Sequence, residues 1–95
     1  TRSFRKCFAE LPEAIQEQAR RSYEQWRENP HHPSLYFKRV HPTEPIYSAR
    51  VALGWRALGL LEGDTVTWFW IGSHGDYDKL LTRSGHLGLD IRDRA

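Results

Sequence analysis

The fold is decided by residues 46–71, which read IYSARVALGWRALGLLEGDTVTWFWI. Aromatic and β-branched residues nearly alternate here with small or polar ones, a pattern typical of β-strands. The pattern predicts three strands, at residues 46–51, 55–60 and 65–71. The links between them are short and turn-rich, and short links join antiparallel neighbours because a parallel pair needs a crossover of a dozen or more residues. The stretch therefore predicts an antiparallel meander.

One further strand is expected just before this stretch. Residues 31–34 read HHPS, a turn signal, and residues 35–40 return to the strand pattern with LYFKRV. At the other end, WFWI at residues 68–71 places apolar side chains on both faces of the last strand. Strands that are covered on both faces usually lie inside a sheet. We therefore expect the last strand to be central.

Two helices are expected before the strands. The apolar stripe of the first consists of Phe4, Cys7, Phe8 and Leu11. The second helix follows Pro12 and ends at Asn29, since proline is favoured in the first turn and Asn-Pro ends the pattern. Its apolar stripe consists of Ile15, Ala19, Tyr23 and Trp26. Both stripes recur at helical spacing, so each helix has one face to bury.

Together these elements predict an α+β fold. Two N-terminal helices pack on one face of a four-stranded, mainly antiparallel twisted sheet, and residues 75–82 form a short C-terminal helix. A chain of 95 residues buries too little surface for two cores, so we expect one domain at residues 1–82. Residues 83–95, with two glycines and alternating charge, are expected to form a flexible tail. The other sheet face is then available for a site.

Composition narrows the classes of function. The lone Cys7 cannot form an internal disulfide, and a small domain from an oxidising compartment usually carries several, so we expect a cytoplasmic protein. No apolar run approaches the roughly 20 residues that cross a bilayer, and we expect no membrane partner. The charge surplus of +2 permits a polyanionic partner without requiring one. Metal-ligand spacings and Gly-rich phosphate loops do not occur, so we expect neither a metal nor another cofactor.

Two arginines are predicted to face each other. If residues 52–54 form a three-residue hairpin link, Arg50 and Arg56 stand opposite each other on adjacent strands. Like charges so placed repel, and an anion between them would relieve the repulsion, since the arginine fork matches a phosphate. The simpler interpretation, which spacing alone favours, is that each arginine pairs with a surface carboxylate such as Glu44 or Asp64.

A second candidate group follows the last strand. His74 can accept or donate a proton near neutral pH, and the hydroxyl of Tyr77 can orient or share that task. Alternatively, Asp76 caps the closing helix while His74 is exposed and Tyr77 packs against the core. On the first strand, Lys38 and Arg39 either contact phosphate or protect a sheet edge from aggregation. Spacing leaves these alternatives open.

Five motifs follow one another along the chain: FxxxFxxLP at 4–12, NPHHPSL at 29–35, YSARV at 47–51, WRALG at 55–59 and WIGSHxxY at 70–77. In order and spacing they resemble the RelE/ParE superfamily of toxins from bacterial type II toxin–antitoxin systems. The resemblance implies the helix-on-sheet fold described above and a cognate antitoxin as partner. It spans roughly residues 4–81.

The resemblance also implies a target. RelE-like members cut messenger RNA on the ribosome without a metal, by attack of a 2′-hydroxyl on the adjacent phosphate. By position, Arg56, Arg50, His74 and Tyr77 match catalytic positions of these nucleases. Lys38 and Arg39 are then the candidate RNA-binding residues.

The sequence departs from the RelE-like pattern in one respect. Many RelE-like nucleases carry several lysines on their second and third strands, whereas this chain offers Lys38 and Arg39. ParE-like members instead poison DNA gyrase and need no nuclease residues, so gyrase inhibition is the leading alternative. A non-catalytic protein-binding module of the same fold is the third.

Overall fold

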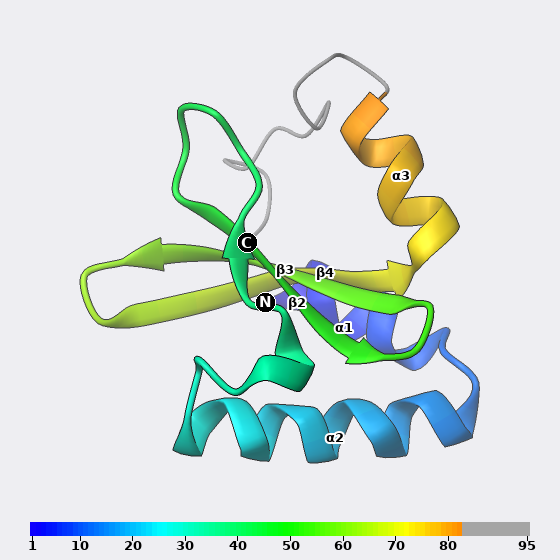
Figure 1. Ribbon diagram of the computed structural model, residues 1–95. Helices are drawn as coiled ribbons and strands as arrows, with labels where there is room; N and C mark the ends of the chain where they lie inside the picture. Colours follow the sequence, from blue (N-terminus) through cyan, green and yellow to red (C-terminus); the bar gives the residue numbers. More distant parts are fainter. Residues whose placement is uncertain (83–95) are drawn as a thin grey trace.

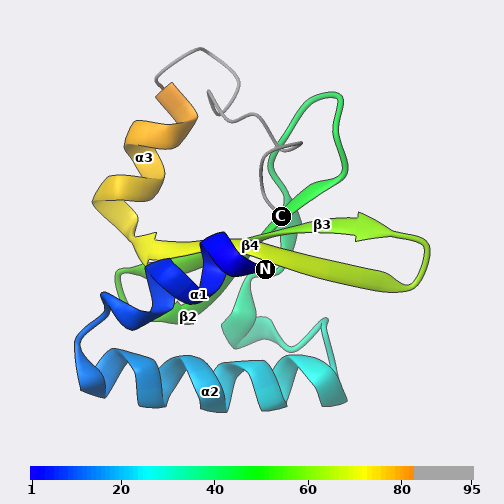
Figure 2. The ribbon, with the colours of Figure 1, turned by 180° about the vertical axis from the view of Figure 1, so that it is seen from behind.

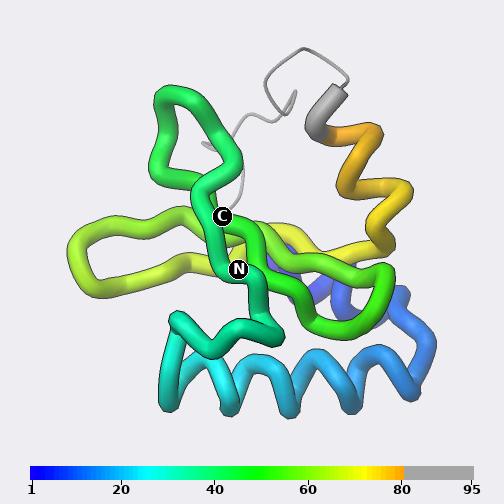
Figure 3. Tube along the Cα trace, viewed as in Figure 1, coloured from blue at the N-terminus to red at the C-terminus, as the bar shows by residue number. Residues whose placement is uncertain are grey.

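The computed structural model describes residues 1–82 and has the α+β architecture expected from the sequence (Figure 1). The elements are α1 (Arg2–Ala9), α2 (Glu13–Glu28), a short 3-10 helix η1 (Pro33–Leu35), β1 (Lys38–Arg39), β2 (Ile46–Ala52), β3 (Trp55–Glu62), β4 (Thr65–Ser73) and α3 (His74–Thr82). The Cα trace in Figure 3 follows the same path, with α2 running beneath the sheet. The predicted tail at 83–95 lies outside the described residues.

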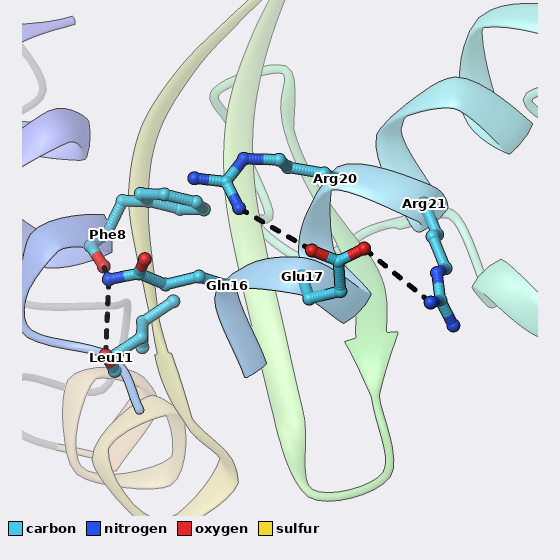
Figure 4. Close-up of polar contacts among 6 residues, drawn as sticks. All are labelled: Phe8, Leu11, Gln16, Glu17, Arg20 and Arg21. Atoms are coloured by element: carbon cyan, nitrogen blue, oxygen red, sulfur yellow. Dashed lines mark hydrogen bonds and ion pairs between the residues drawn. The ribbon is translucent and has the colours of Figure 1, made fainter. Parts of the chain in front are cut away.

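The turn between α1 and α2 is fixed by one side chain. Gln16 Nε2 donates to the carbonyl oxygens of Phe8 and Leu11 at 3.1 and 3.2 Å, and so ties the start of α2 to the end of α1 (Figure 4). Leu11 lies just beyond α1 but is buried, which explains why it continued the apolar stripe. The outer face of α2 carries exposed ion pairs, among them Glu17 with Arg21 at 3.5 Å.

The sheet is antiparallel throughout, with strand order β1-β2-β3-β4. The expectation that the last strand is central was wrong, because β4 hydrogen-bonds to β3 alone and forms an edge of the sheet. Its two apolar faces have a different cause. Helix α1 packs on β4 from one side, and α3 contacts β4 and β3 with side chains that belong to the other face.

A β-bulge breaks the expected alternation in β4. Leu58 pairs with Trp70 and the next residue, Gly59, pairs with Trp68, so Phe69 is the extra residue of the bulge. Phe69 and Trp70 therefore lie on the same face, whereas strict alternation would separate them. Trp68 turns to the opposite face and lies over Gly59, where a Cβ would come within 2.8 Å of the indole.

The first strand is much shorter than predicted. Residues 35–40 were expected to be extended, but the strand spans only Lys38–Arg39, with one further backbone hydrogen bond from Val40 to Ile46. Two local features explain the difference. His32 Nδ1 accepts the N–H of Ser34 at 3.2 Å and caps the 3-10 helix, and Tyr36 then adopts the left-handed conformation with φ 45°. Neither conformation can continue a strand.

Two apolar clusters lie on opposite faces of the sheet. The helix face, against α1 and α2, buries Leu11, Ala19, Val51, Ala57 and Ile71. The α3 face buries Ile46, Leu58, Leu60, Phe69 and Tyr77. Viewed from behind, α1 lies across the sheet while α3 stands apart at the end of β4 (Figure 2). The α3 face is thus only partly available for a binding site, because α3 covers a portion of it.

An aromatic cluster joins α2 to the sheet on the helix face. The Trp26 ring lies 5.3 Å from Trp68 and 5.9 Å from Phe37, both edge-on, and Phe37 stacks on Tyr47 at 4.9 Å. Such edge-on contacts are favourable beyond the area that they bury.

Within residues 1–82, no helix is both long enough and apolar enough to cross a membrane.

Candidate functional site

The two candidate arginines lie directly opposite each other. The register of β2 and β3 pairs Arg50 with Arg56. The link is a two-residue turn at 53–54 rather than the expected three-residue link at 52–54, and a bulge at Val51 produces the same pairing. Both side chains belong to the α3 face, because Arg56 has the strand parity of the buried Leu58. Among the residues that the structure describes, neither arginine forms an ion pair with a carboxylate, so the expected partners Glu44 and Asp64 do not neutralise them.

Arg56 is buried, with 9% of its surface exposed. Its Nε donates to Ser48 Oγ at 2.7 Å and its Nη2 to the carbonyl oxygen of Tyr36 at 3.4 Å, while its guanidinium carbon lies 5.3 Å from the centre of the Tyr77 ring. Burial lowers the pKa of the Arg56 guanidinium, Tyr77 opposes that shift, and the positive charge of Arg50 adds to it. The site thus concentrates positive charge, and a bound anion would offset the free-energy cost of burying that charge.

His74 begins α3 beside the β2–β3 turn. Its backbone N–H donates to the carbonyl oxygen of Gly54 at 2.7 Å, which ties the helix to that turn. The Nδ1 atom lies 3.2 Å from Asp78 Oδ2 one helical turn later, and 54% of the His74 side chain is exposed. An acceptor at Nδ1 favours the tautomer with Nδ1 protonated, which leaves Nε2 able to accept a proton.

The sequence offered a structural interpretation for this segment, and the structure supports part of it. Ser73, not Asp76, caps α3, because Ser73 Oγ accepts the N–H of Asp76 at 3.1 Å. Tyr77 is 5% exposed and packs in the α3-face cluster, which fits its interpretation as a core residue. Its ring nevertheless contacts both candidate groups, since the His74 ring lies 5.7 Å away and Arg56 sits over its face.

These side chains meet at one pocket. A surface pocket of about 280 Å³ is lined by Tyr36, Arg50, Arg56 and His74 together with residues 52–55 of the turn. Three of the four candidate catalytic residues therefore reach the same space, and Tyr77 lies beneath them. The N-terminus of α3 adds its partial positive charge at this point. The pocket is suited to a phosphate-sized anion held beside a proton acceptor.

The two candidate RNA-binding residues do not lie together. Lys38 pairs with Ser48 and Arg39 with Tyr47, and residues opposite each other in a sheet share a face. Lys38 therefore belongs to the α3 face with the arginines, whereas Arg39 belongs to the helix face. Both are exposed.

Sequence reasoning missed three residues of the site. Ser48, which accepts from Arg56, has the same parity as Arg50, so alternation could have placed it there. Asp78 follows His74 by four residues on a helix, which is a recognisable contact spacing. Tyr36 gave no such signal, because it was expected inside a strand and its left-handed backbone depends on the fold around it.

Comparison with known proteins identifies the family. The sequence profile of the ParE-like toxin domain matches residues 13–79, which include every residue of the site. The chain belongs to the ParE-like toxin domain family. It is thus a toxin of the RelE/ParE superfamily, as the motif order indicated. No curated protein sequence matches the chain.

A solved structure shares the fold of this ParE-like domain. It is a chain from the crystal structure of the RelB–RelE antitoxin–toxin complex from Methanococcus jannaschii, with a TM-score of 0.67 and 18% sequence identity. The match covers 82% of this chain and 93% of that one. Such a likeness establishes the shared α+β architecture.

Among residues 1–82, no group of three or more histidine, cysteine or acidic side chains is arranged to hold a metal ion.

Proposed function

We propose that this ParE-like toxin is a metal-independent endoribonuclease that cleaves messenger RNA on the ribosome. The observation that carries the proposal is the Arg50–Arg56 pair, in which a buried arginine faces a second one with no carboxylate between them in the described chain. A fold bears that repulsion more easily when an anion binds there. A phosphodiester is the anion whose chemistry the neighbouring His74 can also use.

The proposed reaction is an internal transfer at phosphorus. His74 Nε2 accepts the proton of the 2′-hydroxyl, the 2′-oxygen bonds to the adjacent phosphorus, and the bond from phosphorus to the 5′-oxygen breaks. The departing oxygen takes a proton from solvent. Arg56 and Arg50 stabilise the extra negative charge that develops on the phosphoryl oxygens. The products are a 2′,3′-cyclic phosphate and a 5′-hydroxyl, and no atom is oxidised or reduced.

Two residues support this reaction without touching substrate. Asp78 orients the His74 ring through Nδ1, at 3.2 Å. Tyr77 fixes Arg56 from below, and its burial leads us to assign the proton transfer to His74 rather than to its hydroxyl. Arg56 is also held by Ser48, so its guanidinium is oriented before substrate binds.

The expected partners follow from the same proposal. A cytoplasmic toxin that cuts messenger RNA must be masked in its host, and we propose a cognate antitoxin as the masking partner. The structural relative named above was crystallised as an antitoxin–toxin complex. The remaining partners are the ribosome and its message, to which Lys38 and the two arginines would present one basic face.

Translating ribosomes provide the test. Purified toxin is treated with EDTA to remove any bound metal, exchanged into the Mg²⁺ buffer that the ribosomes need, and added to them, and the message is mapped by primer extension. We expect cuts within ribosome-bound message that leave a cyclic phosphate, and we expect Arg56→Ala to abolish them while remaining folded. Intact message in the presence of a toxic, folded protein contradicts the proposal.

DNA gyrase inhibition is the second candidate function. The matching profile is that of a ParE-like domain, and Lys38 supplies one lysine on the site face where RelE-like nucleases carry several. The discriminating assay is gyrase-dependent supercoiling with the same protein. Double-strand breaks or lost supercoiling, with message intact, assign the toxin to gyrase. Growth that continues when the chain is expressed alone points to a non-catalytic module.

A further inference from the structure

Tyr36 forms the exposed wall of the pocket. Tyr36 is 57% exposed and is among the large aromatic residues that this fold leaves on its surface. The guanidinium carbon of Arg50 lies 5.1 Å from the centre of its ring, within the range of a cation–π contact. An aromatic face is therefore held next to the arginine pair, with much of its surface open to solvent.

The backbone of Tyr36 is held in an unfavourable conformation. Its φ and ψ are both 45°, and within residues 1–82 it is the one non-glycine residue with positive φ. Its N–H donates to the carbonyl oxygen of Pro33 at 3.3 Å, and its own carbonyl accepts from Arg56 at 3.4 Å. Strain of this kind persists where surrounding contacts impose it, and it concentrates at functional sites. The backbone that carries the ring is thus tied to Arg56.

We propose that Tyr36, with Arg50 beside it, stacks a nucleobase of the RNA next to the cleaved phosphate and thereby sets the nucleotide preference. The proposal rests on the nuclease function proposed above. Proteins that read single-stranded RNA stack unpaired bases on tyrosine rings and arginine planes. One such stack contributes about 5-fold to 150-fold in affinity. Arg56 binds the phosphate, and Tyr36 holds the base of a nucleotide next to that phosphate.

The sequence offers matched variants. Tyr36→Asn removes the ring but keeps the left-handed backbone, which asparagine tolerates. Tyr36→Phe keeps the stacking face and loses only the hydroxyl. Tyr23 is the control, because it is also exposed and carries Arg27 at 5.9 Å, but it lies on α2 away from the pocket.

The experiment uses ribosomes programmed with a message that carries 2-aminopurine, a base whose fluorescence falls on stacking, at successive positions of the codon in the vacant decoding site. A 2′-deoxy sugar at the cleaved nucleotide prevents cutting. We expect the wild type to quench one position, Tyr36→Asn to lose that quench and to weaken binding at least 5-fold, and Tyr36→Phe and Tyr23→Asn to retain both. In cleavage of normal message, Tyr36→Asn should also lose the nucleotide preference.

Other results overturn the inference. If the wild type cleaves message and Tyr36→Asn matches it in quench, rate and preference, Tyr36 does not stack a base although the nuclease function stands. If Tyr36→Asn loses only antitoxin binding, the ring belongs to a protein interface. If the wild type neither cleaves nor binds, the nuclease proposal fails and this inference fails with it.

Discussion

Arg56 places a charge in a buried position where stability alone would favour an apolar side chain. A buried charge without a carboxylate partner carries a desolvation cost, and an apolar residue of similar volume removes that cost. We therefore expect Arg56→Met to change the free energy of unfolding by no more than about 2 kcal/mol, while toxicity and message cleavage fall about 10²-fold or more. Thermal melting and the ribosome assay measure the two effects.

The companion variant removes the hydrogen-bond partner. Arg56→Met leaves Ser48 Oγ without its donor, and Ser48 is fully buried. Replacing both partners by apolar groups is less costly than stranding one of them. The double variant Arg56→Met with Ser48→Ala should thus be at least as stable as Arg56→Met alone. A double variant that melts well below both single variants contradicts this account of the pair.

His74 and Asp78 should differ strongly in their effect on rate. Removing a proton carrier costs about 10²-fold to 10⁴-fold, which is the expectation for His74→Ala. The His74–Asp78 pair is more than half exposed, and exposed ion pairs contribute at most about 1 kcal/mol. Asp78→Asn should then slow cleavage by no more than about fivefold. Asp76→Asn, an exposed carboxylate on the same turn, is the control, and an equal loss in all three variants argues against this assignment.

At the scale of residues, the sequence predicted contacts that depend on strand parity and missed those that depend on tertiary support. The expected pairing of Arg50 with Arg56 is observed, although a two-residue turn at 53–54 and a bulge at Val51 replace the three-residue link at 52–54. The left-handed Tyr36 could not be foreseen, because it ends the 3-10 helix capped by His32 and its carbonyl oxygen accepts from Arg56, a residue twenty positions away. Local propensity carries no information about such a contact.

Among the elements, the β3–β4 hairpin depends on a glycine. A Cβ on Gly59 would meet Val66 Cγ1 at 2.5 Å and the Trp68 indole at 2.8 Å. Overpacking of this kind typically costs about 1–3 kcal/mol, and each kcal/mol lowers the melting temperature of a domain this size by about 4–8 °C. Gly59→Ala should melt lower by an amount in that range. Gly75→Ala is the control, because its Cβ meets nothing closer than 4.0 Å and alanine favours the helix.

The same hairpin explains why the strand positions and the meander order were predicted correctly, whereas the central place expected for the last strand was wrong. Residues 46–51, 55–60 and 65–71 fall within β2, β3 and β4, since β-branched and aromatic patterning is a local signal. The bulge at Phe69 shifts the alternation by one residue, and the apolar faces of β4 reflect α1 and α3 rather than neighbouring strands. Neither feature leaves a mark in a period-two pattern.

For the whole molecule, Trp26 joins α2 to the sheet. Its ring contacts Phe37 and Trp68, and its Nε1 is buried with no hydrogen-bond partner in the described structure. Trp26→Ala should cost about 3–5 kcal/mol, a large part of the stability of a small domain. Trp26→Phe keeps a ring and loses no hydrogen bond, so it should cost much less. Equal melting temperatures for Trp26→Ala and the parent contradict the packing described.

The division of basic residues between the two sheet faces leads to a prediction about how salt affects RNA affinity. A protein that neutralises phosphates on single-stranded nucleic acid releases counterions, and the slope of log affinity against log salt changes by about 0.7 for each phosphate contact. Arg50 and Lys38 lie on the α3 face, whereas Arg39 belongs to the helix face. If RNA binds over the α3 face, Arg50→Gln and Lys38→Gln should each lower the magnitude of the slope by about 0.7.

Arg39→Gln is the matched control, because it removes the same charge one residue along the chain. Its slope should equal that of the wild type, with a small and uniform loss of affinity from long-range attraction. The measurement uses an uncleavable 2′-deoxy message on the ribosome, so that the difference between variant and parent isolates the protein's own contacts. Equal slopes for Lys38→Gln and Arg39→Gln would mean that the RNA does not distinguish the faces. The bound strand would then have to lie outside the face that gathers Arg50, Arg56 and His74, and the nuclease geometry would lose its substrate path.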